Sequence, residues 1–397
     1  MRERSHVSPL GIAFGIALTA GVVVAWTPRS WRVSLAIASI SIVAALWAVT
    51  AKSIRLPWQT IPVALIGVWG FIQLAFGASA IPHTTLRSSS LLAVSAIVFI
   101  LGSQILQNRR ARHSFLNLML WVSTVLAGLA MLQTYTSPGL VLWLFPAEDS
   151  VLGTFYYRNQ FAAFMEIAAP IALWQILRER VAVGGICYAV IFAATLTSAS
   201  RSGVTLVSAE LIIFLAFMVF QQQLPLKSAV SLVTVFALLL AGASIIAGTE
   251  RTVNHFETPD FYDVARRQMA NSTLKLIAER PWTGWGVGTW RAVYPRFATF
   301  DLAAIANEAH NDWLQWAAEG GIPFALLFAV LAIWLVKPSV ESVWGMGVPM
   351  VLVHSYVDYP LREPAVAFLW FAMAGAVAQT TWASSTPGQD VMPVSSE

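Results

Sequence analysis

Residues 115–135 read FLNLMLWVSTVLAGLAMLQTY and contain no charged side chain. A helix that crosses the hydrocarbon core of a bilayer needs about 20 mostly apolar residues, within a range of about 17–25. This stretch therefore predicts a transmembrane helix. The basic residues just before it, Arg109, Arg110 and Arg112, are typical of a loop that stays on the inner side of the membrane.

Similar apolar runs recur along the whole chain. They predict an all-α polytopic membrane protein with about twelve transmembrane helices. The expected spans are 10–26, 33–51, 61–80, 88–106, 115–135, 161–177, 183–199, 204–220, 228–247, 314–336, 343–357 and 364–382.

The composition supports this prediction. Of the 397 residues, 57% are hydrophobic and only 11% are charged, whereas a soluble domain has about 25% charged residues. The net charge of +4 is spread over loops, which favours a topological role over nucleic-acid binding. The single Cys187 lies in an apolar run, so a disulfide framework and a cysteine metal site are excluded.

The distribution of basic residues predicts the orientation. With the N-terminus inside, eleven Lys and Arg residues fall in inner segments and six in short outer loops. Arg29 and Arg32 oppose this bias locally. Long loops are discounted, because they cross the membrane regardless of charge. We therefore expect both termini on the inner side of the membrane.

One long outer segment, residues 248–313, interrupts the spans. It holds 15 of the 44 charged residues and is rich in aromatic residues, so it is expected to fold. A helix is expected over about 262–280, ended by Pro281, and a second from near Asn307 into the tenth span. The predicted organisation is spans one to nine in 1–247, a periplasmic loop at 248–313, spans ten to twelve in 314–382 and a polar cytoplasmic tail at 383–397.

Two arginine-bearing segments lie where an anionic ligand could bind. Ser200-Arg201-Ser202-Gly203 sits at the outer boundary between two short spans. In the expected loop helix, Arg266 and Arg280 share one face, and Arg267 adjoins Arg266. A guanidinium suits a phosphate. Lipid-headgroup contact by Arg201 and a solvated amphipathic loop helix remain open as alternatives.

Two histidine-bearing segments lie at the same membrane face. His310 precedes the tenth span, and an imidazole there can take a proton from a hydroxyl group near neutral pH. A structural histidine is the alternative. Glu319 is out of phase with His310 on a straight helix. The segment from His354 to Arg362 either lines the same site or braces a short loop, and bracing is favoured.

Several familiar signatures are missing from the sequence. It has no Walker loop, no Asp-x-Asp pair and no Gly-x-Ser-x-Gly elbow, and its histidines match no zinc spacing. Gly284, Gly286 and Gly288 follow no predicted strand, so nucleotide binding is disfavoured. We expect no cofactor and no metal site.

In their order and spacing, these segments resemble the O-antigen ligase and O-antigen polymerase family of bacterial envelope glycosyltransferases. The resemblance covers about the C-terminal two-thirds of the chain. The residues that carry it are Gly153–Ala162, Ser200–Gly203, Arg266, Pro281, Gly284–Gly288, His310–Leu314, Glu319–Gly321, His354-Ser355 and Asp358–Pro360.

The resemblance implies an enzyme that takes a glycan from undecaprenyl diphosphate at the periplasmic face, without a metal ion. It implies that Arg201 and Arg266 bind the diphosphate, with Arg267 and Arg280 as further candidates, and that His310 is the catalytic base. Supporting roles are expected for Arg158, Asn159, Asn311, Glu319, His354 and Asp358. The family usually has an aromatic residue four positions after the loop arginine, where this chain has Ala270.

The acceptor is left open by the sequence. Lipid A–core for a ligase, a growing glycan for a polymerase, and a protein hydroxyl for an O-glycosylating enzyme all suit the same donor chemistry. The alternative functions are a small-solute transporter, such as a bicarbonate transporter, and a structural scaffold. A transporter usually shows internal repeats and ionisable residues near mid-span, and no repeat is visible here.

Overall fold

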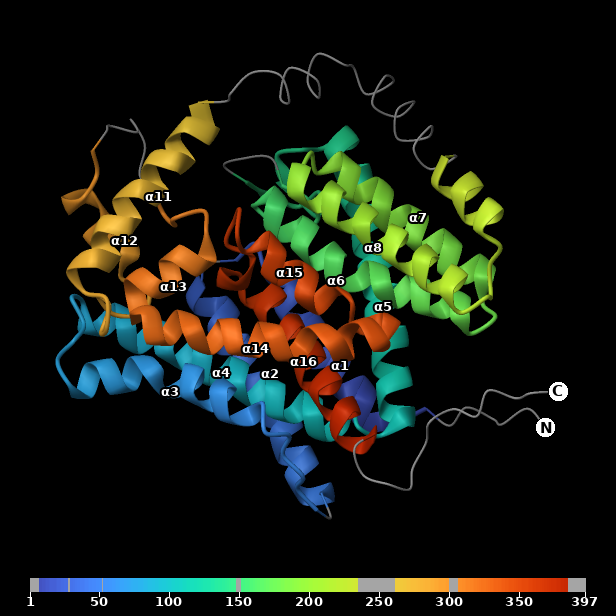
Figure 1. The fold of residues 1–397 in the computed structure, drawn as a ribbon, viewed down its shortest axis with the longest axis horizontal. Helices are drawn as coiled ribbons and strands as arrows, with labels where there is room; N and C mark the ends of the chain where they lie inside the picture. Colours follow the sequence, from blue (N-terminus) through green and yellow to red (C-terminus); the bar gives the residue numbers. More distant parts are fainter. Residues whose placement is uncertain are drawn as a thin grey trace.

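The computed structural model describes residues 7–27, 29–51, 53–147, 151–234, 261–299 and 306–384. These residues form a helical bundle with one two-stranded hairpin (Figure 1). The labelled helices of eight or more residues are α1 (Pro9–Val23), α2 (Arg29–Thr50), α3 (Thr60–Ala75), α4 (Pro82–Ile105), α5 (Arg109–Thr136), α6 (Arg158–Leu177), α7 (Val181–Thr197), α8 (Arg201–Phe220), α11 (Phe261–Glu279), α13 (Asp312–Gly320), α14 (Ile322–Glu341), α15 (Gly347–His354) and α16 (Pro364–Ser384).

The shorter elements lie in the connections. They are the hairpin strands β1 (Leu140–Val141) and β2 (Phe145–Pro146), the short helix α12 (Trp290–Val293), and the 3-10 turns η1 (Tyr294–Arg296), η2 (Val343–Gly345) and η3 (Pro360–Arg362). Residues 226–234 are also helical. The rest of the predicted ninth span, the first part of the predicted loop (248–260) and the end of the predicted tail (385–397) lie outside the described residues.

Helix α5 shows why the apolar runs become helices that face lipid. Asn108 caps its start by accepting hydrogen bonds from the backbone N–H groups of Arg110 and Ala111, at 3.0 and 3.1 Å. One face of α5 is buried in the bundle, and the opposite face exposes Trp121 and Val125. A soluble protein rarely exposes a contiguous apolar face, whereas a lipid-facing helix does so by necessity.

The predicted fold class, an all-α membrane protein, is confirmed. Within the described residues, five helices are long and apolar enough to cross a membrane, namely α4, α5, α6, α8 and α14. Six shorter apolar helices accompany them. The number of twelve crossings and the periplasmic loop remain predictions.

The tenth span was expected to be one continuous helix, and this prediction is wrong. The stretch is broken into α13 and α14 at Gly321, whose φ of +81° favours glycine, and the expected helix from Asn307 begins only at Asp312. Pro323 lies in the first turn of α14, where its missing N–H costs no helical hydrogen bond. The Gly-Gly-Ile-Pro sequence thus ends one helix and starts another.

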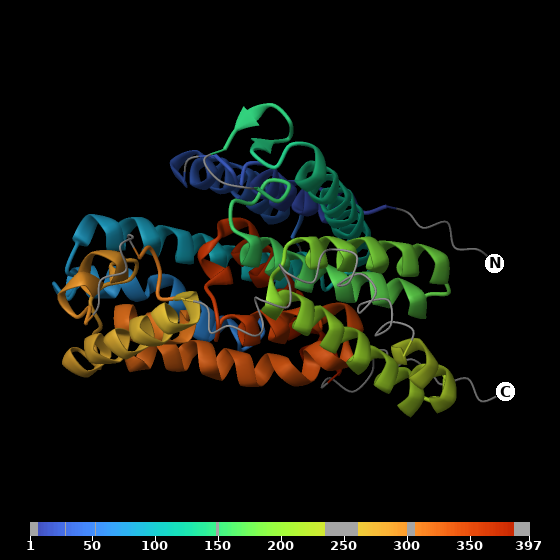
Figure 2. The same ribbon diagram turned by 90° about the horizontal axis from the view of Figure 1, so that it is seen from above.

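The glycine series at 284–288 is a docking turn. Gly284 and Gly286 have φ values of +62° and +106°, and a side chain on Gly284 would collide with the backbone of Glu319. From α3, Gln73 donates to the carbonyl of Thr283 at 2.6 Å and accepts from the N–H of Val287 at 3.0 Å. The turn therefore holds α11–α13 against α3, and Figures 1 and 2 show these helices together at one end of the molecule.

Several connections meet at a single end of the bundle. The hydroxyl of Thr154, in the α5–α6 connection, donates to the carbonyl of Val22 at the end of α1, at 2.7 Å. Helix α6 starts beside this contact and is the most deeply buried of the five long apolar helices. Its first turn thus presents side chains to a junction of loops that are far apart in the sequence.

Candidate functional site

Asp358 is the centre of a polar cluster at this junction. It lies between α15 and α16, and only 1% of its surface is exposed. Its Oδ2 accepts a hydrogen bond from the Tyr157 hydroxyl at 3.1 Å and pairs with Nη2 of Arg266 at 3.3 Å. The Asn159 amide donates to the same oxygen. One buried carboxylate therefore joins the start of α6 to α11.

His310 reaches the other oxygen of this carboxylate. Its Nδ1 lies 3.6 Å from Oδ1 of Asp358 and 3.4 Å from the Tyr157 hydroxyl, and its ring packs edge-to-face on Tyr359, with centroids 5.0 Å apart. A proton on Nδ1 that points to the carboxylate leaves the lone pair on Nε2. The side chain of His310 is 24% exposed, so its ring is partly accessible to a substrate.

The backbone of His310 is also unusual. Its φ is +52°, in the left-handed region that non-glycine residues seldom adopt, although histidine, asparagine and aspartate tolerate it better than most. The following residue, Asn311, caps α13 by accepting from the Leu314 N–H at 3.0 Å. Such strain is found preferentially at functional sites, where the surroundings hold it in place.

The charge of Asp358 is maintained by its neighbours. Burial alone would raise its pKa, but the hydrogen bond from His310 and the charges of His310, His354 and Arg266 outweigh burial and hold the pKa below its ordinary value. Burial raises the pKa of Tyr157 and of Tyr359, so both phenols stay protonated. The cluster is therefore a carboxylate surrounded by donors.

The arginines of α11 have different environments. Arg266 pairs with Asp358 and keeps 31% of its side chain exposed, and Arg267 beside it is exposed. Arg280 follows the end of α11, with its guanidinium 4.0 Å from the Trp285 ring centre. At 1.5 Å per residue, Arg280 lies roughly 20 Å along the helix from Arg266. The structure thus brings Arg266 to the cluster and separates Arg280 from it.

Arg201 is the first residue of α8, and a second buried network fixes this helix start. The Ser202 hydroxyl lies 2.9 Å from Nε2 of His354, and Nδ1 of His354 lies 2.7 Å from Oε1 of Glu166. The carbonyl of His354 accepts from the N–H of Asp358 at 3.0 Å. The start of α8 is therefore tied to the segment that carries Asp358, while Arg158, the exposed first residue of α6, adjoins Asn159.

A third network ties the His310 segment to the α15–α16 connection. Arg362 bonds Oδ1 of Asp312 through Nε at 3.1 Å and Oε2 of Glu319 through Nη1 at 2.8 Å. Burial raises the pKa of Asp312 to about 7, against the opposing effect of Arg362. The segment His354–Arg362 therefore contributes to the cluster through Asp358 and also braces the loop through Arg362.

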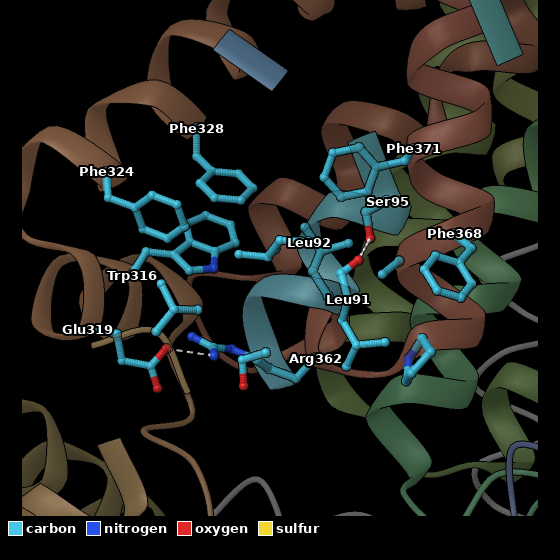
Figure 3. Close-up of a pocket in the computed structure, with 15 residues that line it drawn as sticks. Leu91, Leu92, Ser95, Trp316, Glu319, Phe324, Phe328, Arg362, Phe368 and Phe371 are labelled. Atoms are coloured by element: carbon cyan, nitrogen blue, oxygen red, sulfur yellow. Dashed lines mark hydrogen bonds and ion pairs between the residues drawn. The ribbon is translucent and has the colours of Figure 1, made fainter. Parts of the chain in front are cut away.

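An apolar crevice with a cavity volume of about 60 Å³ lies beside this brace (Figure 3). Trp316, Phe324 and Phe328 form one wall, and residues of α4 and α16 form the other. The Arg362–Glu319 ion pair lies at one edge. The crevice thus offers an apolar surface close to the charged networks.

Sequence reasoning missed the tyrosines and the long-range ion pairs. Tyr157 and Tyr359 adjoin residues that were singled out, but nothing in the sequence indicates that their rings stack at 5.2 Å. Glu166 and His354 lie 188 positions apart, so only the fold reveals their contact. Asn159, in contrast, was expected from the family resemblance, and it lies buried in the first turn of α6.

The family comparison bears directly on this geometry. A family model described as O-antigen ligase matches residues 186–329. This stretch carries an O-antigen ligase domain, and the family predicted from the sequence is confirmed. The ligase domain includes Arg201, Arg266 and His310, while Asp358 and Asn159 lie outside it. No curated protein matches the chain.

The match of residues 186–329 to this family supports an enzyme of the glycosyltransferase type with a glycan-transfer function at a membrane. The candidate membrane helices agree with this assignment. The candidate membrane helices and the matched domain together support a multi-pass membrane protein with a role in lipopolysaccharide-type glycan assembly. The family gives no support to a small-solute transporter.

Proposed function

We propose that the protein transfers a glycan from undecaprenyl diphosphate to an acceptor hydroxyl at the periplasmic face of the inner membrane. The observation that carries the proposal is the shared carboxylate: Asp358 contacts both His310, a candidate base, and Arg266, a candidate phosphate ligand. A base and a cation held by one rigid group can act on opposite ends of a single displacement.

The reaction then needs one step. Nε2 of His310 accepts the proton of the acceptor hydroxyl as that oxygen attacks the anomeric carbon. The bond from this carbon to the diphosphate oxygen breaks, and the diphosphate leaves with the electron pair. Attack opposite the leaving group inverts the anomeric configuration. Asp358 stabilises the resulting imidazolium.

The arginines supply the positive charge for the leaving group. A guanidinium has five N–H groups, so Arg266 can bond Asp358 and still present donors to a phosphate oxygen. Arg201, at the fixed start of α8, is the second proposed ligand. Preorganised donors of this kind stabilise charge that develops in the transition state.

The predicted topology and the apolar crevice support the proposed location of the site at the periplasmic face of the membrane. The connections that meet at the cluster follow α1, α5, α7, α11 and α15. With the predicted N-inside orientation, all of these connections fall on the periplasmic side. The crevice of Figure 3 gives isoprenoid carbons an apolar surface near the charged site. Both features suit a donor with a lipid tail and a polar head.

The function is tested by a transfer assay in proteoliposomes. The donor is an undecaprenyl-diphosphate-linked glycan, and the acceptors are lipid A–core, a second lipid-linked glycan and a serine-containing peptide. Release of undecaprenyl diphosphate together with a modified acceptor is expected, and the modified acceptor distinguishes ligase, polymerase and protein glycosylation. Failure with every acceptor would contradict the proposal.

Conservative changes at the arginines should separate their roles. Arg201→Lys and Arg266→Lys should each lower kcat/KM for glycan transfer by roughly 10- to 100-fold, because an ammonium cannot reproduce the planar two-point contact with a phosphate. Arg267→Lys is the matched control from the same helix and should change kcat/KM little. An equal or greater loss in Arg267→Lys would assign the diphosphate contact to Arg267.

Removal of metal ions by a chelator should leave the rate of glycan transfer unchanged. In the proposed mechanism, guanidinium groups neutralise the diphosphate, as a metal ion does in many enzymes that use nucleotide sugars. Transfer measured with and without EDTA is therefore expected to agree within error. Loss of transfer in EDTA that added Mg²⁺ or Mn²⁺ restores would show that a metal ion is required and that the arginines are insufficient.

A further inference from the structure

A second, polar pocket adjoins the cluster, and it shares Arg362 and Pro364 with the lining of the crevice of Figure 3. It has a cavity volume of about 310 Å³, at the lower end of the range of about 300–1,000 Å³ for small-molecule sites. Its walls include Tyr156, Tyr157, Tyr359, Gln160 and Glu308. Aromatic faces next to hydrogen-bonding groups are suited to a sugar, which has apolar C–H faces and a rim of hydroxyls.

Two residues of the pocket wall, Tyr157 and Tyr359, also contact the candidate base His310. Tyr157 bonds Asp358 and approaches Nδ1 of His310, and Tyr359 packs against the His310 ring. The rings of these two tyrosines are stacked, with an angle of 9° between their planes. A ligand in the pocket thus lies one side-chain layer from His310.

The charge of the pocket differs from that of the arginine side. Glu308 and Glu363 contribute carboxylates, and Arg362, the basic residue of the wall, is bonded to Asp312 and Glu319. Glu308 also accepts from Gln315 at 2.5 Å, which fixes its position. An anionic diphosphate would be repelled here, whereas sugar hydroxyls or an ammonium would find hydrogen-bond acceptors.

We propose that this pocket binds the terminal sugar of the acceptor and selects neutral or amino sugars over phosphorylated or uronic ones. The proposal rests on the proposed function, because it assigns the second substrate to the same His310. Tyr156, with 43% of its surface exposed, provides the open aromatic face, and Glu308 provides the charge selection. The donor head group then lies on the Arg266 side.

The aromatic contact is tested with Tyr156→Ala. The acceptor KM should rise on the order of tenfold, while binding of undecaprenyl diphosphate to the purified protein stays at the wild-type value. Tyr135→Ala, at an exposed tyrosine (79% exposed) near the end of α5, is the matched control and should change neither quantity. An unchanged acceptor KM in Tyr156→Ala would overturn the proposal.

The charge selection is tested with Glu308→Gln, which keeps an oxygen for the Gln315 contact. The probes are three trisaccharides, one built from glucose, one from glucosamine and one from galacturonic acid. Their binding to the protein in nanodiscs is measured by saturation-transfer NMR. Wild type should bind the first two, and Glu308→Gln should improve galacturonic acid binding relative to glucosamine by about fivefold. Glu341→Gln on α14 is the control and should leave the preference unchanged.

Direct binding separates this proposal from the proposed function. If wild type transfers no glycan but binds the glucose and glucosamine probes through Tyr156, the sugar subsite stands and the transfer function fails. If transfer occurs but no probe binds, or galacturonic acid binds best, the subsite proposal is overturned and the transfer function stands.

Discussion

Replacing His310 with asparagine is expected to lower kcat for glycan transfer by about 10²- to 10⁴-fold, the usual contribution of a general base. Asparagine tolerates the left-handed backbone at this position, where φ is +52°, and its amide can donate to Asp358. It cannot take a proton from a hydroxyl. The loss should therefore report chemistry and not misfolding. The measurement is single-turnover transfer with saturating donor and acceptor.

The asparagine variant is a sharper test than alanine. Alanine also removes the proton acceptor, but it is less tolerant of the positive φ and leaves the Asp358 carboxylate without its His310 partner. His310→Asn should retain the wild-type melting temperature and the wild-type affinity for undecaprenyl diphosphate. A kcat within threefold of wild type would exclude His310 as the base and would favour a purely structural role.

Much of the fold follows from local sequence signals. The apolar run at 115–135 lies inside α5, and Asn108 supplies the cap that starts the helix. Helix α11 ends at Glu279, two residues before Pro281, close to the expected end. The break at Gly321 was missed because the run 314–336 is mostly apolar, with Glu319 as its one charged residue, and is long enough to span. Two glycines followed two residues later by a proline were the available signal.

The candidate site was only partly predictable. Arg266, His310 and Asp358 were each singled out, but their contact depends on three segments that are 44 and 48 positions apart in the chain. Hydrophobic periodicity places helices and does not place loops against one another. The side chains that complete the cluster, Tyr157 and Tyr359, are common residue types whose role appears only when α6 and the α15–α16 connection meet.

Asp358→Asn is expected to cause a loss of similar size, about 10²- to 10⁴-fold in kcat, by disturbing His310. Oδ2 of Asp358 accepts from Tyr157, Asn159 and Arg266, and Oδ1 accepts from the Tyr359 N–H at 2.8 Å and faces His310. In Asp358→Asn, an NH₂ group replaces one of these two oxygens. This NH₂ group must then face one of the two sets of hydrogen-bond donors. If it faces His310, Nδ1 becomes the acceptor and the proton moves to Nε2, which then cannot act as a base.

A double-mutant cycle decides whether Asp358 acts through His310. Because the pKa of Asp358 is held below its ordinary value, the residue is a carboxylate throughout the neutral pH range and does not itself compete for the proton. The variant with both Asn substitutions should therefore be no slower than His310→Asn alone, since residues that act as a unit are not additive. Losses that multiply would instead show that Asp358 serves the diphosphate side, through Arg266, independently of the base.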